Sequence, residues 1–470
     1  MAVNDLPGPP AVARQDAQAL RAVFVSAGYR GDDARRLLQT ESGLLPDSAS
    51  LPIARRRAAA VDTPLAALVS LFLLGEPLEE PERRLGPGAE LLVAAGLARE
   101  EGGTLRRQVA VVPHDDVLIA SDDPHGAVRA TYVPEVSRSS ATLASLTVRK
   151  PVERALDVGT GNGIQAVLAS RHAGAVVATD VSERALAFAE FNCALNEADN
   201  VELRLGSFLE PAAGERFGLV VSNPPFAISP DHDLVFRDGG LGRDRVSEEL
   251  ALSLPSVLEP GGFGSMTAAW IVEGDDSAAR PREWLERAGC DGWVLYEEPV
   301  DALTSAFGWI GSADAAAIDR WLDYFTSERI ERVTFGVLVL RPKDGQGWTC
   351  SRRLPDEPAP AGPHLERLFA GAGLTQSELT AAPLMLAPDV DIEQLIRRSP
   401  DGWQLAHAAL KLTGGLQFRT SVDESVLELV RSLDGRPLAS VLDAMPEDER
   451  AKVSAVARKL LLLGFLVPVE

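Results

Sequence analysis

Apolar runs of two different periods alternate through the middle of the chain. Two strand-like, β-branched runs, RALDVG and AVVATDV, are accompanied by segments with apolar residues at helical spacing, GIQAVLASRHA and ERALAFAEFNCALN. Further strand-like runs follow: VELRLG, GLVVSNPP, FGSMTAAWIV, GWVLYEE and RVTFGVLVLRP. Strands that alternate with helices predict a doubly wound α/β domain with right-handed crossovers between parallel strands. The last strands are expected to add an antiparallel edge.

The segments on both sides of this domain have a mostly helical pattern. Residues 11–39 and 62–97 carry apolar positions at helical spacing. The stretch that follows, GLAREEGGTLRRQVAVVPHDDVLIASD, changes to a period of two around a Gly-Gly pair and predicts a β-hairpin. Helices followed by a hairpin resemble a winged helix. A second module of this kind is predicted near the C-terminus, where residues 447–463 form an amphipathic helix.

A stretch rich in proline and polar residues, SRRLPDEPAPAGPHLE, is interpreted as a linker. The length of 470 residues leaves room for about three domains. The predicted fold class is α/β, with a Rossmann-like doubly wound domain flanked by N- and C-terminal, mostly helical, winged-helix-like modules. The predicted boundaries are 1–125 for the N-terminal module, 126–350 for the α/β domain, 351–366 for the linker and 367–470 for the C-terminal module.

Composition narrows the choice of compartment and partner. The sequence shows neither a long apolar membrane span nor a basic and apolar secretory leader in MAVNDLPGPP. The cysteines Cys193, Cys290 and Cys350 are too widely separated for a disulfide framework or a zinc site, so no metal site is predicted and a cytoplasmic location is expected. The net charge of −22 opposes binding to a phosphate backbone, which weighs against nucleic-acid partners unless a basic patch exists locally.

Candidate chemistry begins at Asp157-Val158-Gly159-Thr160-Gly161-Asn162-Gly163, where a strand runs into closely spaced glycines and then a helix. Such a turn lets the backbone approach a ligand closely at the carboxyl edge of a sheet. Asp180 ends the next strand, about 20 residues later, and a carboxylate there suits the hydroxyls of a ribose. Its structural alternative is an N-cap for the following helix. Gly206-Ser207-Phe208 follows the third strand.

The stretch Val221-Ser222-Asn223-Pro224-Pro225-Phe226 ends a fourth strand. Two consecutive prolines remove two backbone donors and stiffen the chain, so the strand cannot continue. The alternative interpretation of this stretch is an ordinary loop with turn residues.

Together these motifs resemble class I S-adenosylmethionine-dependent methyltransferases over residues 150–345. Specifically, they resemble the group with a (D/N/S)-P-P-(Y/F) motif, which includes release-factor glutamine N5-, rRNA guanine-N2 and adenine-N6 methyltransferases. The resemblance implies S-adenosyl-L-methionine as the cofactor. It assigns donor binding to Asp157, Gly159, Thr160, Gly161, Asn162, Gly163, Asp180, Val181, Ser207, Phe208 and Asn223, and catalysis to Asn223, Pro224, Pro225 and Phe226.

The chemistry of a planar nitrogen explains the second motif. The lone pair of an amide or exocyclic amine is delocalised, so the nitrogen must be oriented before it attacks a methyl sulfonium. The Asn223 side-chain oxygen and the Pro224 carbonyl can each accept one N–H, and Pro225 keeps the turn rigid. Phe226 offers a face for stacking.

Two segments depart from the glutamine methyltransferases. The tract from Phe236 to Arg245 only approximates their "GG-x-D-G" tract, and its arginines Arg237, Arg243 and Arg245 could steer an anion or form ion pairs within the loop. The segment from Tyr132 to Thr142 occupies the place of their "P-R-x-E-T-E" lid segment, without its arginine and glutamates.

Most of the other notable aromatic and histidine side chains are expected to have structural roles. The tryptophans Trp270, Trp293, Trp309 and Trp321 are expected to pack in the core or at its edge. His232 lies six residues beyond Phe226 and is a further candidate for contact with substrate.

The sequence therefore predicts an N-methyltransferase that modifies a planar nitrogen of a protein or peptide. The alternatives are a base N-methyltransferase of rRNA or tRNA, a methyltransferase of small-molecule or peptide natural products, and a non-catalytic cofactor-binding scaffold. The substrate, the oligomeric state and the role of the flanking modules stay open at this point.

Overall fold

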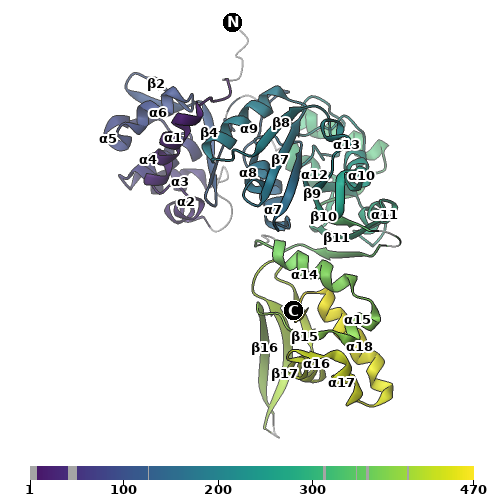
Figure 1. Cartoon of the computed structure of the whole chain (residues 1–470). Coiled ribbons are helices and arrows are strands. Elements are labelled where there is room, and N and C mark those ends of the chain that lie inside the picture. Colours follow the sequence, from purple (N-terminus) through teal and green to yellow (C-terminus); the bar gives the residue numbers. More distant parts are fainter. Residues whose placement is uncertain are drawn as a thin grey trace. The chain divides into compact units, whose positions relative to one another are not determined.

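The computed structural model describes residues 8–40, 50–124, 126, 128–310, 314–343, 345, 347–355, 359–399 and 402–469. These residues belong to two compact units (Figure 1). Unit 1 comprises residues 1–144 and 150–352, and unit 2 comprises residues 145–149 and 353–470. The stretch in which no secretory leader was found begins with residues 1–7, which lie outside the described residues. Within the predicted linker, residues 356–358 also lie outside them. The predicted domain boundaries stay predictions.

The N-terminal part of unit 1 is helical and ends in two β-hairpins. The predicted hairpin around the Gly-Gly pair is confirmed: Glu101 pairs with Thr104, and Gly102 and Gly103 both have positive φ, as a tight hairpin turn requires. A winged helix stays a prediction. The elements are α1 (Arg14–Ser26), α2 (Gly31–Leu38), α3 (Leu51–Ala59), α4 (Pro64–Leu68), the π-helical turn η1 (Val69–Leu73), β1 (Leu78–Glu79), α5 (Pro81–Leu85), α6 (Gly88–Ala94), β2 (Ala98–Glu101), β3 (Thr104–Arg107), β4 (Val109–His114) and β5 (Val117–Asp122).

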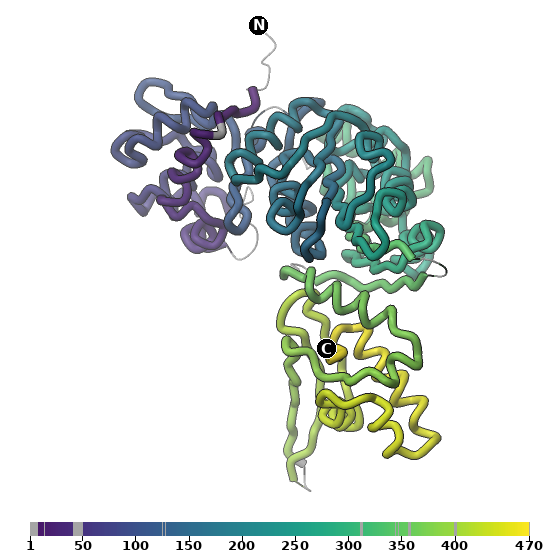
Figure 2. Tube along the Cα trace, in the orientation of Figure 1, coloured from purple at the N-terminus to yellow at the C-terminus, as the bar shows by residue number. Residues whose placement is uncertain are grey.

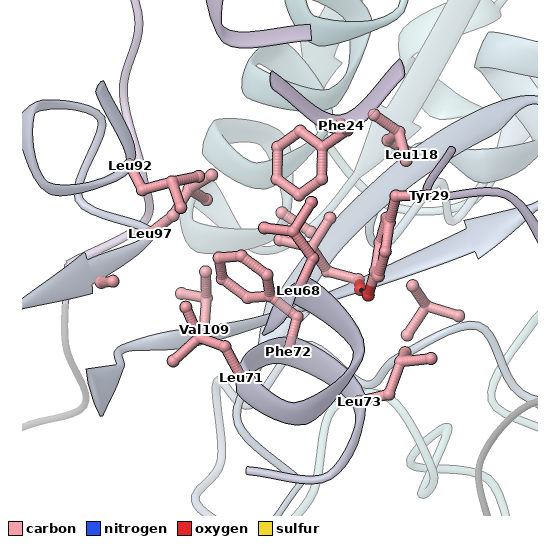
Figure 3. Close-up of a cluster of buried hydrophobic side chains, with 14 of the residues drawn as sticks. Phe24, Tyr29, Leu68, Leu71, Phe72, Leu73, Leu92, Leu97, Val109 and Leu118 are labelled. Atoms are coloured by element: carbon pink, nitrogen blue, oxygen red, sulfur yellow. Dashed lines mark hydrogen bonds between the residues drawn. The ribbon is translucent and has the colours of Figure 1, made fainter. Parts of the chain in front are cut away.

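Aromatic rings fill the centre of this helical part. Figure 3 shows Phe24 between Tyr29 and Phe72 in one cluster, with ring centroids 5.4 Å apart for Phe24 and Tyr29 and 5.6 Å apart for Phe24 and Phe72. The buried Tyr29 hydroxyl donates a hydrogen bond of 2.7 Å to the Val111 carbonyl, which satisfies its polar end. The same apolar cluster includes Phe188 of the α/β domain, so both parts of unit 1 share one core.

Two asparagine side chains form hydrogen bonds with the backbone of strand β5: Asn192 in helix α9 (Glu183–Leu195) and Asn196, the C-cap of that helix. The Asn192 side chain accepts from the Ala120 amide and donates to the Ala120 carbonyl, both at 2.8 Å. Asn196 does the same for Leu118, at 2.9 and 2.7 Å. One helix turn separates the two asparagines, and two residues separate their partners on the strand. The amides thus replace a neighbouring strand and satisfy buried backbone groups of β5.

The α/β prediction is confirmed by a sheet of order β14-β11-β13-β10-β9-β6-β7-β8, with the short β12 paired to β13. Strands β8, β7, β6, β9 and β10 are parallel, whereas β13 runs antiparallel to both β10 and β11. The antiparallel part thus includes an interior strand, β13. The strands are β6 (Val152–Val158), β7 (Ala173–Asp180), β8 (Val201–Leu205), β9 (Phe217–Ser222), β10 (Leu258–Ile271), β11 (Cys290–Tyr296), β12 (Val300–Asp301), β13 (Arg332–Pro342) and β14 (Thr349–Arg353).

The order of the parallel strands creates a switch point. From β6 the chain continues outward through β7 and β8, then returns to β9 on the other side of β6. Loops diverge where the order reverses, so the carboxyl ends of β6 and β9 are the expected place for a ligand. The remaining helices of this domain are α7 (Arg138–Leu146), α8 (Ile164–Ala169), α9, α10 (Arg245–Ser253), α11 (Ala279–Arg287), α12 (Ala302–Ile310) and α13 (Ala315–Ser327), with short turns η2 (Glu210–Ala212) and η3 (Leu254–Val257).

Unit 2 combines helices with two small sheets of order β19-β15-β20 and β16-β17-β18. The predicted amphipathic helix is confirmed as α18, and α14 begins inside the predicted linker. Figure 2 shows the hairpin of β16 and β17 extending beyond the helices of the same unit. The elements are α14 (Gly362–Gly373), α15 (Gln376–Ala381), β15 (Pro383–Leu386), β16 (Val390–Ser399), β17 (Gly402–Leu412), β18 (Arg419–Val422), α16 (Glu424–Leu433), β19 (Arg436–Pro437), α17 (Leu438–Asp443), α18 (Glu447–Leu462) and β20 (Leu466–Pro468).

Among the described residues, no helix has both the length and the apolar character needed to cross a membrane.

Candidate functional site

A cavity of about 500 Å³ lies at the carboxyl edge of the sheet, where β6, β7 and β9 end. Its volume falls within the range of small-molecule and cofactor sites. The structure brings all but one of the predicted site residues to its wall; the exception is Gly163. The predicted residues that line it are Asp157, Gly159, Thr160, Gly161, Asn162, Asp180, Val181, Ser207, Phe208, Asn223, Pro224, Pro225 and Phe226.

Asp157 is a buried carboxylate one residue before the end of β6. Its Oδ2 accepts hydrogen bonds from the Thr160 hydroxyl at 2.7 Å and from the Ala166 amide at 3.0 Å. Its Oδ1 has no hydrogen-bond partner within the described parts of the chain. Burial raises the pKa of Asp157 to about 7; the two hydrogen bonds oppose this shift and the nearby Asp180 adds to it. A buried acceptor of this kind is costly unless a ligand supplies a donor or a positive charge.

Asp180 ends β7 and binds the glycine turn. Its Oδ2 accepts from the Gly161 amide and its Oδ1 from the Ser182 amide, both at 2.9 Å. The N-cap of α9 is Ser182, whose side chain accepts from the Ala185 amide, so Asp180 does not have the capping role that was its structural alternative. Burial raises the pKa of Asp180, and hydrogen bonds from backbone amides counteract that shift.

The three glycines of the turn have different roles. Gly159, Gly161 and Gly163 all have positive φ, which favours glycine at each position. A Cβ on Gly163 would lie 3.0 Å from the Cα of Ala189 on α9. Gly163 therefore permits close packing of α8 on α9, whereas Gly159 and Gly161 face the cavity.

Phe208 forms an apolar part of the wall after β8. Its φ is +46°, a left-handed conformation that residues with a side chain rarely adopt. A strained conformation persists only where the surrounding structure maintains it, and such residues cluster at active sites and ligand-binding sites.

The NPPF stretch follows directly after β9 and forms another part of the wall. The Phe226 ring packs against Phe335, with centroids 5.1 Å apart, and against Trp309 in an edge arrangement at 5.8 Å. Trp309 lines the cavity and is 38% exposed. The expectation that the tryptophans are packing residues was therefore incomplete for Trp309, whereas Trp270 and Trp321 are buried.

The Asn223 side chain is held at both ends. Its Oδ1 accepts a hydrogen bond of 2.6 Å from the Thr267 hydroxyl. Its Nδ2 donates to the hydroxyls of Ser140 at 3.0 Å and Ser139 at 3.3 Å. Thr267 lies in the middle of β10, and no signal in the sequence pointed to it.

Other residues of the wall come from the segment compared above with a lid. Tyr132, Ser139 and Ser140 all line the cavity, so the position of this segment was a usable signal although its residues differ. The Tyr132 ring lies 5.7 Å from that of Phe236, another residue of the wall.

Two of the three candidate anion-steering arginines, Arg237 and Arg243, are engaged in contacts with other residues. Arg237 is buried and paired with Asp238 at 2.6 Å and Asp231 at 3.2 Å, with its guanidinium 5.4 Å from the Trp321 ring centroid. These contacts favour the alternative of ion pairs within the loop and hold it beside the cavity.

The remaining candidates of this loop differ in position. The Arg243 guanidinium donates to the Glu328 carbonyl at 2.9 Å. Neither Arg243 nor Arg245 is part of the cavity wall, whereas His232 is.

Comparisons with known proteins agree with this geometry. Residues 134–237 match the family model "Methyltransferase small domain", and residues 371–468 match a domain of unknown function, DUF7782. The chain is 36% identical over 191 residues to a release factor glutamine methyltransferase of Xylella fastidiosa, covering 37% of this chain and 64% of that protein.

Further relatives are similar over shorter spans. A release factor glutamine methyltransferase of Cereibacter sphaeroides is 38% identical over 135 residues, covering 26% of this chain and 48% of that protein. A ribosomal protein uL3 glutamine methyltransferase of Bradyrhizobium diazoefficiens is 31% identical over 177 residues, covering 35% and 52%. The chain thus spans less than two thirds of the length of each of these relatives.

Proposed function

We propose that this chain is an S-adenosylmethionine-dependent N-methyltransferase, because residues 134–237 match the methyltransferase small domain and a release factor glutamine methyltransferase is 36% identical over 191 residues. We propose a side-chain amide of a protein, of the glutamine type, as its target. The observation that carries this proposal is the single cavity wall shared by the glycine turn, Asp180 and the NPPF stretch. Donor-binding and acceptor-orienting groups thereby face the same space.

The residues of the wall fit this methyl donor. The donor carries a positively charged amino group, a ribose diol and an adenine ring. The unpartnered Oδ1 of Asp157 suits the positive group, the Asp180 carboxylate suits the diol, and Phe208 offers an apolar contact. When bound, the donor supplies an activated methyl group on a sulfonium.

The chain's own contribution is orientation. The Asn223 side-chain oxygen and the Pro224 carbonyl would accept the two N–H groups of a primary amide. This fixes the amide plane and stabilises the positive charge that develops on the attacking nitrogen. As the N–CH₃ bond forms, the nitrogen loses one proton, which would leave through one of the two oxygens that accept its N–H groups and pass to solvent.

The surroundings of the cavity favour a protein over a nucleic acid. Helix α12 leads to Trp309 and exposes 47% of Leu303 and 43% of Phe307. Leu303 and Phe307 are not part of the cavity wall, and exposed apolar side chains on this helix suit contact with a peptide. The net charge of −22 opposes a phosphate backbone. The relatives named above modify glutamine in release factors and a ribosomal protein, which supports the same class.

Paired substitutions test this division of roles. Asn223→Ala should leave the donor Kd within about twofold and reduce methyl transfer by about 100-fold or more, as loss of a transition-state hydrogen bond does. Asp180→Ala should weaken donor binding by about tenfold or more, since a charge-assisted hydrogen bond is lost. Calorimetry with the donor and initial rates of transfer distinguish the two. Full activity of Asn223→Ala would show that the NPPF stretch does not orient the acceptor.

A further inference from the structure

We infer that Thr267 is a positioning residue of this site, whose hydroxyl holds the Asn223 side-chain oxygen in place to accept an N–H of the substrate. This inference rests on the proposed function. It follows from the hydrogen bonds around Asn223 and from the position of Thr267 in the sheet.

The register of the sheet places Thr267 beside the motif. Strand β10 runs parallel to β9, and Met266 pairs with Ser222, the last residue of β9. The residues that follow this pair are Thr267, on β10, and Asn223, directly after β9. Thr267 is fully buried, and its β-branched side chain has few rotamers available in a strand. Its hydroxyl is consequently a rigid neighbour of the Asn223 side chain, 2.6 Å from Oδ1.

The Asn223 amide lies with its oxygen toward Thr267 and its nitrogen toward the serines, and the three hydroxyls, each able to donate or accept, match this orientation. An amide oxygen only accepts hydrogen bonds, and an amide nitrogen only donates them. The Thr267 hydroxyl donates to Oδ1, and the hydroxyls of Ser139 and Ser140 accept from Nδ2. An oxygen has two acceptor positions, so Thr267 leaves one for a substrate N–H. If the amide were reversed, its NH₂ group would meet the substrate's N–H, and the contact would be repulsive.

The serines form a linked group at the start of α7. The Ser137 hydroxyl lies 2.8 Å from that of Ser139 and 3.1 Å from that of Ser140. The Gln165 side chain donates to the Ser140 carbonyl at 2.8 Å, which fixes this helix start on α8. The serines therefore hold the amino end of the Asn223 amide from one side while Thr267 holds its oxygen from the other.

Substitutions at Thr267 test the inference, with a matched control on the same strand. Thr267→Val removes the hydroxyl but keeps the shape of the side chain, whereas Thr267→Ser keeps the hydroxyl. Ser265→Ala is the control, because the buried Ser265 hydroxyl has no hydrogen-bond partner among the described residues and does not line the cavity. Activity is the initial rate of transfer from radiolabelled S-adenosylmethionine to the protein fraction of a lysate that lacks this protein.

The expected result separates positioning from a merely structural role. Thr267→Val should lower the initial rate at saturating donor by about 10- to 100-fold, with the donor Kd and the Tm close to those of the wild type. Thr267→Ser should restore most of the rate, and Ser265→Ala should match the wild type. In the Asn223→Ala background, Thr267→Val should cause no further loss, because the two residues act as one unit. A Thr267→Val variant as active as the wild type, beside an inactive Asn223→Ala, would overturn the inference and leave the proposed function intact.

A readout without turnover completes the test. In protein labelled with ¹⁵N at asparagine, the two side-chain N–H resonances of Asn223 should shift and exchange faster with water in Thr267→Val. Thr267→Ala serves as a second variant should the valine variant fail to fold. Unchanged resonances would overturn the inference whatever the activity. Absence of transfer by the wild type, together with shifted resonances, would instead count against the proposed function alone.

Discussion

At the scale of single residues, Asp157 lies one residue before the end of β6 and Asp180 ends the neighbouring parallel strand β7, yet their surroundings differ. Asp180 accepts backbone hydrogen bonds through both oxygens, from Gly161 and Ser182. Asp157 is more deeply buried, and one of its oxygens has no partner among the described residues. The difference is expected if a ligand supplies the missing partner of Asp157. Without that ligand, the buried Asp157 carboxylate should lower the free energy of unfolding when it is charged.

Asp157→Asn should stabilise the ligand-free chain at pH 8. The folded-state pKa of Asp157 is raised to about 7, above the unfolded value near 3.9. Its contribution to the free energy of unfolding is therefore fully present below about pH 4 and is lost as the pH rises through 7. Removing the charge should regain up to about 4 kcal/mol at pH 8 in urea unfolding. The same variant should bind S-adenosylmethionine about tenfold or more weakly, because a charged contact is lost.

Two results would contradict this assignment. The first is a free energy of unfolding that falls equally between pH 5 and 8 in Asp157→Asn and in the wild type. The other is unchanged donor affinity in calorimetry.

At the scale of elements, local signals explain what the sequence predicted. The glycine turn, Asp180 and the NPPF stretch each follow a recognisable strand, and ends of parallel strands meet at one edge. Thr267 could not be predicted, because it reaches Asn223 only through the register of two strands, 44 residues away along the chain. Trp309 reaches the cavity because α12 is placed there by tertiary packing. The long hairpin of β16 and β17 was missed as well, since its apolar positions are too irregular to indicate a strand.

The turn between β6 and α8 gives a prediction at this scale. Gly163→Ala should destabilise unit 1 by about 2–4 kcal/mol, because a positive φ and a contact of 3.0 Å with Ala189 both oppose a Cβ. Gly159→Ala has the same kind of φ but no atom within 4 Å of its added Cβ, so it should cost only about 1 kcal/mol. Urea unfolding of both variants measures the difference. Equal destabilisation would mean that contact with α9 does not require Gly163.

At the scale of the whole molecule, unit 2 has a polar group inside its own core. His364 on α14 is buried, with Nε2 3.3 Å from the Leu463 carbonyl and Nδ1 accepting from the Leu416 amide at 3.4 Å. Added Cβ atoms at Gly415 and Gly464 would clash with its side chain. Burial, with a contribution from Arg367, lowers the pKa of His364 to about 4. The neutral ring therefore joins α14 to the loops before β18 and β20.

This histidine should make the stability of unit 2 depend on pH. Its folded-state pKa lies below the unfolded value near 6.5, so its contribution is fully present above pH 6.5 and is lost as the pH falls towards 4. The loss should approach about 3 kcal/mol. Hydrogen exchange of peptides from α14 and α18 in the full chain measures it, and His364→Gln should flatten the dependence between pH 4 and 6.5. The same slope in both proteins would show that another group is responsible.

The most direct test of the central claim is the chemical class of the methylated product. The purified chain would be incubated with radiolabelled S-adenosylmethionine and a lysate from a strain that lacks it, and the products treated separately with protease and nuclease. We predict label that protease removes and nuclease does not, and that Asn223→Ala fails to introduce. Label that nuclease removes, or no label in any macromolecule, would contradict an enzyme that modifies a protein amide.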